Sequence, residues 1–191
     1  MDATSLALGA SQYLDELKKV IDQVDVDQVT AVIDTLVRVH DRAGSVYIFG
    51  NGGSASTASH FVTDFNKGIG ASFRLACLND NVPTVLAVAN DIGYDQVFVH
   101  QLHSLLDPTD LVIAISGSGN SPNVVEAVRY AKGRDVETVA LVGYDGGQLR
   151  ELADHCIHVP VPDMQKVEDV HLAMNHLMMT VLKDYLGSRD R

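Results

Sequence analysis

Two loops rich in glycine and serine each follow a short apolar run, and this repeated pattern is the strongest constraint on the fold. The first loop, 50–56, follows the apolar residues 46–49, and the second loop, 116–121, follows the apolar residues 111–115. Each loop therefore lies where a buried strand is expected to pass into a helix. Glycine lets the backbone approach a ligand, serine hydroxyls donate hydrogen bonds, and the first N–H groups of a helix are unpaired. The loops predict a site for an anion, above all a phosphorylated small molecule.

The spacing of apolar residues predicts an α/β fold. Helical spacing predicts two N-terminal helices over about 3–42 and a C-terminal helix over about 164–186, with an α/β core over about 45–160 between them. Apolar strands separated by helices favour a mostly parallel five-stranded sheet covered on both faces. Strands are expected near 45–49, 73–78, 110–115, 137–142 and 156–160, and core helices near 54–67, 82–90, 94–106, 122–133 and 147–153.

Length and composition favour one globular domain. The chain has 191 residues, of which 46% are apolar and 20% charged, and no linker divides it, so we expect a single domain over 1–191. No apolar run approaches the roughly 20 residues that a membrane span needs, and the N-terminus lacks the pattern of a signal peptide. We therefore expect a cytoplasmic protein that does not bind a membrane.

The charge balance and the loop sequences each exclude one class of function. The formal net charge is -11, and the basic residues are scattered, so we expect no nucleic-acid partner. Neither loop contains lysine, which excludes the phosphate loop of nucleoside triphosphatases. With few cations available, the anion would be held by hydroxyls, backbone amides and helix dipoles, as suits a small metabolite.

The spacing of the first loop leaves a dinucleotide site open as an alternative. Gly50, Gly52 and Ala55 satisfy the relaxed dinucleotide-binding pattern, and Asp80 follows the second expected strand, where a ribose-binding acid lies in such folds. The second loop, with its three serines, has no role in such a site. Together the two loops favour a phosphosugar.

His60 and Asp64 lie one turn apart on the helix expected after the first loop, and they share a face of it. Such a pair can bind a divalent metal, can act as a base with an orienting acid, or can form a surface hydrogen bond. The residue pattern alone leaves these three interpretations open.

The C-terminal helix is expected to have two apolar faces. Glu168, Asn175 and His176 share one of them with Leu172 and Met179, which indicates an interface or a cleft in which a metal or a substrate compensates the ionisable groups. Helical geometry alone does not separate Glu168 from Asp169, and it does not fully exclude His171. A polar contact between subunits remains the alternative. The other face is expected to form the core stripe, from Val167, Val170, Met174, Leu177, Met178, Val181 and Tyr185.

These features resemble the sugar isomerase (SIS) domain family, and within it the phosphoheptose isomerases. The similarity covers nearly the whole chain and rests on residues 50–55, 60–61, 89–91, 116–121, 123–124 and 143–147 and on the spacing from Glu168 to His176. The resemblance implies a three-layer α/β/α sandwich preceded by two N-terminal helices. It also implies a homotetramer with active sites between subunits.

The resemblance implies an aldose–ketose isomerase that converts sedoheptulose 7-phosphate to a D-glycero-D-manno-heptose 7-phosphate through a metal-stabilised enediolate. Zinc would be bound by His60, Asp64, Glu168 and His176, although manganese, nickel and cobalt accept similar ligands. Asp64 and His176 would be the catalytic groups that move protons. The implied substrate-binding residues are Asn51, Gly52, Gly53, Ser54, Asn90, Asp91, Ser116, Gly117, Ser118, Ser121 and Glu168.

The chain departs from the family pattern at three of these positions. Glutamate is usual at Asp64, glutamine at Glu168 and threonine at Gly117. Aspartate is one methylene shorter than glutamate, which displaces a base by about one carbon–carbon bond. The charge of Glu168 would hold a divalent cation more tightly and would reduce its Lewis acidity.

A function of another class is the alternative. Some relatives of this fold are binding or regulatory proteins, including one that partners a bacterial replication initiator. The chain could accordingly be a non-catalytic phosphosugar-binding SIS protein with a protein partner. The presence of four candidate metal ligands favours the enzyme.

Overall fold

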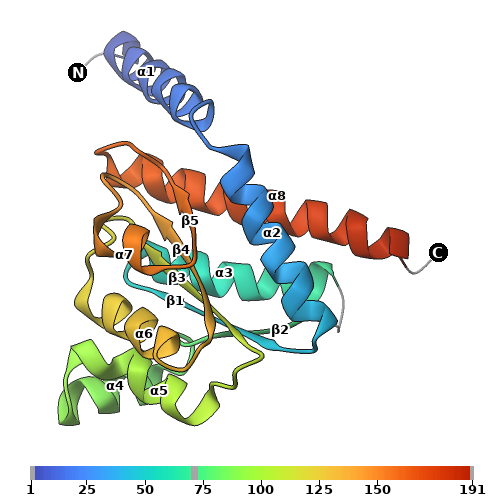
Figure 1. Cartoon of the computed structure of the whole chain (residues 1–191). Helices are drawn as coiled ribbons and strands as arrows, with labels where there is room; N and C mark the ends of the chain where they lie inside the picture. The colour runs from blue at the N-terminus through green and yellow to red at the C-terminus, as the bar shows by residue number, and fades with distance from the viewer. Residues whose placement is uncertain (1–2, 70–72, 190–191) are drawn as a thin grey trace.

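The computed structural model describes residues 3–69 and 73–189, and a parallel five-stranded sheet forms the middle of the molecule (Figure 1). The strand order is β2-β1-β3-β4-β5. The strands β1, β3 and β4 are almost entirely buried, which explains why their sequences are continuous apolar runs. The strands are β1 (Ser45–Gly50), β2 (Arg74–Cys77), β3 (Leu111–Ser116), β4 (Glu137–Val142) and β5 (His155–His158).

Helices cover both faces of the sheet, so the expected α/β/α layers are confirmed. One core cluster joins the sheet to α2, α3 and α8, and the other joins it to α4, α5, α6 and α7 (Figure 1). In the described part of the chain, no helix is long and apolar enough to cross a membrane. The helices are α1 (Ala3–Ile21), α2 (Val26–Asp41), α3 (Gly53–Gly68), α4 (Val82–Asp91), the 3-10 helix η1 (Tyr94–Gln96), α5 (Val97–Leu105), α6 (Pro122–Lys132), α7 (Gly147–Leu152) and α8 (Met164–Arg189).

The order of the strands places the two glycine and serine loops side by side. Strands β1 and β3 are neighbours, with Gly50 paired to Ile115, although β2 lies between them in the sequence. The chain therefore turns in opposite directions after β1 and after β3, and a crevice opens at the carboxyl ends of these strands. In open α/β sheets this switch point is the usual ligand site.

The N-terminal helix α1 extends away from the rest of the molecule (Figure 1). It is attached to the start of α8 by a hydrogen bond of 2.5 Å from the Tyr13 hydroxyl to Asp169 and by an ion pair of 3.0 Å between Glu16 and Lys166. Its apolar side chains are largely uncovered, with exposed fractions of 60% for Leu6, 61% for Leu8 and 56% for Leu14.

The expected core stripe of α8 is wrong for three residues. Leu177, Val181 and Tyr185 are 39%, 44% and 49% exposed. The neighbouring helices cover only a narrow strip of α8, so burial follows a strict four-residue spacing in its second half. The buried positions in this strip are Val170, Met174, Met178, Leu182 and Leu186.

Candidate active site

The first loop turns the chain from β1 into α3 without a side-chain cap. Gly52 has φ of +55°, a backbone conformation that favours glycine, and no side chain caps the helix that begins at Gly53. The first N–H groups of α3 are therefore available to an anion. The side chain of Ser54 is buried beside them.

The second loop is shaped by glycines that make room for neighbouring groups. Gly119 has φ of +65°, and a Cβ there would lie 1.9 Å from the carbonyl oxygen of Gly146. A Cβ at Gly117 would lie 2.4 Å from Sδ of Met164. Glycine at this position, where threonine is usual, therefore leaves space for the methionine.

The serine hydroxyls of the second loop lie close together at the start of α6. Ser116 Oγ donates to Ser121 Oγ at 3.3 Å, and Ser118 Oγ accepts the N–H of Asn120 at 3.2 Å. Ser121 occupies the cap position of α6 but makes no side-chain cap bond. These hydroxyls are therefore not committed to capping the helix.

A cavity of about 250 Å³ brings the two loops together with the start of α8. Nine of the predicted substrate-binding residues line it, but Asn90 and Asp91 do not. These two lie at the end of α4, where Asn90 donates to Asp91 at 2.7 Å. The cavity is lined by Asn51, Gly52, Gly53, Ser54, Ile115, Ser116, Gly117, Ser118, Ser121, Met164 and Glu168.

The carboxamide of Asn51 is fixed by two residues that the sequence did not mark as functional. Asn51 and Asn123 exchange two hydrogen bonds of 2.9 Å, and the Tyr94 hydroxyl donates to Asn51 Oδ1 at 2.9 Å. Asn123 belongs to a stretch that carries the family resemblance, which is the only sequence signal for it. Tyr94 follows Gly93 in a short turn, and nothing in the pattern connects it with the first loop.

His60, Asp64 and His176 form a compact group of possible metal ligands. Asp64 Oδ2 lies 3.1 Å from His60 Nε2 and 3.3 Å from His176 Nε2, and the two Nε2 atoms are 3.2 Å apart. A tetrahedral ion with bonds of about 2.0–2.1 Å has ligand atoms about 3.3 Å apart, so this triangle has the size of one face of such a site. Lone pairs that converge in this way require a cation or protons between them.

The solvent exposure of His60, Asp64 and His176 is that of a catalytic rather than a structural metal site. The side chains of His60 and His176 are 47% and 51% exposed, whereas that of Asp64 is 22% exposed. Three protein ligands with an open fourth position are typical of catalytic zinc sites, whereas structural sites are closed by four protein ligands.

Helices α3 and α8 hold the two parts of the site because they run side by side in the same direction. Gly53 lies against Glu168 near the start of both helices, and Asp64 lies against Asn175 farther along. From the helical rise, His60 lies about 10 Å beyond Gly53. The two glycine and serine loops and the possible metal ligands therefore occupy two ends of one surface.

A family model for the SIS domain matches residues 12–143, which is more than half of the chain. The chain belongs to the SIS domain family. This SIS domain protein also has curated relatives of similar length. It is 33% identical over 165 residues to the phosphoheptose isomerase of Helicobacter pylori, covering 83% of this chain and 84% of that one. It is 32% identical over 181 residues to a probable phosphoheptose isomerase of Thermoplasma acidophilum, covering 93% and 99%.

Solved structures of phosphoheptose isomerases are also similar to this SIS domain protein. The phosphoheptose isomerase GmhA from Neisseria gonorrhoeae superposes with a TM-score of 0.89 at 28% identity, covering 94% of this chain and 99% of that one. A phosphoheptose isomerase from Francisella tularensis, at 22% identity and a TM-score of 0.87, covers 96% and 100% and has the same fold. Within the SIS family, the chain is of the phosphoheptose isomerase type.

In this SIS domain protein, the Glu168 carboxylate lies at the end of the site that the glycine and serine loops form. Its oxygen atoms lie 2.3 and 2.4 Å from the point that a Cβ of Gly53 would occupy, over the first turn of α3. Glu168 is not part of the triangle formed by His60, Asp64 and His176. Three of the four predicted ligands thus converge within one chain, and the fourth faces the serine loops.

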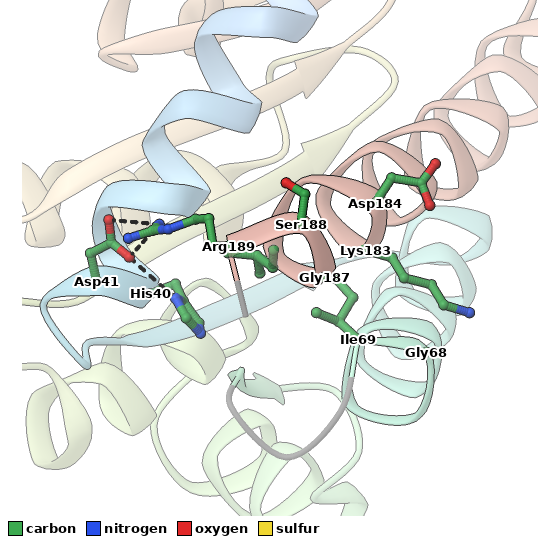
Figure 2. A pocket seen from close by; sticks show the side chains of 10 residues that line it. His40, Asp41, Gly68, Ile69, Lys183, Asp184, Gly187, Ser188 and Arg189 are labelled. Carbon is green, nitrogen blue, oxygen red and sulfur yellow. Dashed lines mark hydrogen bonds and ion pairs between the residues drawn. The ribbon is translucent and has the colours of Figure 1, made fainter. Parts of the chain in front are cut away.

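A larger cavity of the SIS domain protein, about 850 Å³, begins at Gly68, one turn beyond Asp64 on α3 (Figure 2). It is formed by the ends of α2, α3 and α8, and Figure 2 shows Asp41 facing Arg189, with which it makes an ion pair of 2.9 Å. Within the described chain, its lining includes no predicted site residue. The chemistry-bearing residues gather instead in the smaller cavity and beside it.

Proposed function

We propose that this chain is a phosphoheptose isomerase that converts sedoheptulose 7-phosphate to a D-glycero-D-manno-heptose 7-phosphate. The observation that carries the proposal is the triangle of His60, Asp64 and His176 beside a cavity lined by serine hydroxyls. The curated relatives from Helicobacter pylori, which are named as phosphoheptose isomerases, support the same activity.

We propose that the substrate phosphate binds between the serine loops. Ser54, Ser116, Ser118 and Ser121 would donate hydrogen bonds to it, and the first N–H groups of α3 would add a positive dipole end. Asn51, Gly52, Gly53, Gly117 and Glu168 would complete this part of the site. Asn90 and Asp91 remain proposed substrate contacts from outside the cavity.

The reacting carbons would lie at the other end of the surface. A divalent metal, zinc in this proposal, would be held there by His60, Asp64 and His176 and would supply a Lewis acid for a sugar oxygen. Asp64 and His176 would move the proton between adjacent carbons of the sugar. The reaction would pass through an enediolate. For Glu168 the geometry supports substrate binding better than metal binding, because its carboxylate faces the anion end.

We propose that the enzyme is a single-domain cytoplasmic protein that assembles as a homotetramer with active sites between subunits. The exposed apolar side chains of Leu177, Val181 and Tyr185 continue along α8 from His176. Contiguous apolar surface of this kind is typical of an interface, and most oligomers are symmetric assemblies of one chain. A subunit contact there would also reduce the solvent exposure of His176.

The proposed activity can be tested by incubating zinc-loaded protein with sedoheptulose 7-phosphate and following the aldose signal by NMR. We expect turnover by the wild type and none by His176→Ala, which should still bind sugar phosphate because the serine loops are unchanged. His100→Ala, which alters an exposed histidine on α5, is the matched control and should remain active. Absence of wild-type turnover with zinc, manganese, nickel or cobalt would refute the activity, and retained metal without turnover would favour the regulatory alternative.

A further inference from the structure

Asn175 is a buried polar residue on α8 next to the proposed catalytic His176. It is fully buried, and its Nδ2 donates a hydrogen bond of 2.9 Å to Oδ2 of Asp64 on α3. Its other polar atom, Oδ1, has no hydrogen-bond partner among the residues that the structure describes. The carboxamide therefore makes one hydrogen bond, and that bond is directed at a possible metal ligand.

The orientation of the Asn175 carboxamide follows from chemistry. An ionised carboxylate only accepts hydrogen bonds, so the NH₂ group of Asn175 must face Asp64, because the reverse orientation would bring two acceptor oxygens together. A buried carbonyl without a partner is unfavourable, and an apolar side chain of similar size would avoid this cost. Core packing therefore does not account for asparagine at this position, whereas the bond to Asp64 does.

Asn175 holds the oxygen atom of Asp64 that forms part of the ligand triangle. Oδ2 of Asp64 faces both His60 Nε2 and His176 Nε2, at 3.1 and 3.3 Å. The other carboxylate oxygen, Oδ1, has no hydrogen bond within the described residues. A carboxylate turns about two side-chain bonds, and hydrogen bonds from surrounding residues are what usually orient the ligands of a metal site.

We propose that Asn175 is a positioning residue that fixes Oδ2 of Asp64 in the ligand triangle and leaves Oδ1 to take the substrate proton. The bond gives the two oxygens of one carboxylate different tasks, so Asp64 can hold a cation and act as a base. The role of Oδ1 rests on the proposed isomerase function. The role of Oδ2 requires only that the site binds a divalent cation.

The test is a cobalt titration of chelator-treated protein, followed by the visible absorption bands of bound Co²⁺. Asn175→Leu removes the donor while keeping the site filled, and we expect its Co²⁺ affinity to fall by about 10- to 100-fold. Val170→Ala, which shortens a buried apolar side chain of the same helix, is the control for lost stability and should retain wild-type affinity. With sedoheptulose 7-phosphate, kcat of Asn175→Leu should fall while KM changes little, because the serine loops are unchanged.

A double-mutant cycle separates positioning from a general effect on the helix. In an Asp64→Ala background, Asn175→Leu should change Co²⁺ affinity by less than about twofold, because the group through which it acts is absent. Equal losses in both backgrounds, unchanged Co²⁺ affinity in the single variant, or a wild type that binds no Co²⁺ would each overturn the proposal. A wild type that binds Co²⁺ but does not isomerise the sugar would refute the proposed function and with it the role of Oδ1, whereas the cobalt measurements would still decide whether Asn175 positions Oδ2.

Discussion

At the residue scale, α8 has a second buried polar side chain one turn before Asn175. His171 is fully buried, and its Nε2 donates to the carbonyl oxygen of Val142 at 3.3 Å. Its Nδ1 has no hydrogen-bond partner in the described chain. Burial lowers the pKa of His171 to about 4, so its imidazole is neutral at pH 7.

This burial predicts a loss of stability in acid. The unfolded chain takes up a proton on His171 near pH 6.5, whereas the folded chain resists protonation down to about pH 4. Between these values the unfolded state binds more protons, so the contribution of His171 to stability falls by about 1.4 kcal/mol per pH unit as the pH is lowered.

Urea denaturation of metal-free wild type and His171→Gln, at pH 6.5 and at pH 5, measures this contribution. Between the two pH values we expect the wild type to lose about 2 kcal/mol more than the variant, which has no group titrating at this position. Other ionisable groups cancel in the comparison. Equal losses of stability for both proteins would show that His171 has the same pKa in the folded and the unfolded state.

The position of Glu168 predicts a change in anion affinity. Glu168→Gln removes a negative charge beside the first turn of α3, where the phosphate is proposed to bind. The relief of repulsion is on the order of 1 kcal/mol, so the Kd for inorganic phosphate should fall about fivefold, as measured by calorimetry. Asp169→Asn changes the net charge equally, at an exposed neighbour outside the cavity, and should have little effect. Weaker binding by Glu168→Gln would show that the carboxylate assists the anion.

At the scale of elements, the sequence predicted the strands and the two loops well, because both depend on local pattern. Continuous apolar runs followed by glycine- and serine-rich loops marked β1 and β3, and the topology of parallel strands then brought the loops together. The expected helix over 94–106 is instead divided into η1 and α5 after Gly93, whose φ is +148°.

The arrangement of the C-terminal helix could not be predicted in the same way. A helical wheel gives the direction of a side chain around the axis but not the neighbour that it meets along the axis. Glu168 and His176 share a face, yet eight residues separate them by about 12 Å, so they reach different ends of the site. The bond between Asn175 and Asp64 depends on the packing of α3 against α8, which no local pattern specifies.

The second loop predicts a strong effect of one added methyl group. Gly119→Ala would place a Cβ 1.9 Å from the Gly146 carbonyl oxygen at a positive φ, so the loop must move. We expect a loss of at least about 2 kcal/mol in the free energy of unfolding together with loss of phosphate binding. Gly133→Ala, at the end of α6, meets only ordinary contacts of 3.5 Å and should be nearly neutral in both assays. Wild-type phosphate affinity in Gly119→Ala would contradict the proposed role of this loop.

At the scale of the whole molecule, one chain leaves apolar surface uncovered in two places. Helix α1 extends from the core with Leu6 and Leu14 exposed, and the second half of α8 exposes Val181 and Tyr185. Surfaces of this kind are typical of contacts between protein chains. The proposed homotetramer would cover them.

The assembly predicts that a charge on α1 weakens association. Leu14→Glu should shift the protein toward smaller species at micromolar concentration, as measured by light scattering after size-exclusion chromatography, while circular dichroism remains that of the folded chain. Gln12→Glu adds the same charge at an exposed polar position of α1 and should assemble normally. If Leu14→Glu assembles like the wild type, α1 does not contribute to the contact.

The parallel course of α3 and α8 has a consequence for substrate choice. Both ends of the site lie on the same two packed helices, so in the proposed enzyme the backbone would fix the distance from the phosphate to the reacting carbons. The two helices would therefore set a minimum substrate length: a sugar phosphate with a shorter carbon skeleton would bind at one end without reaching the other.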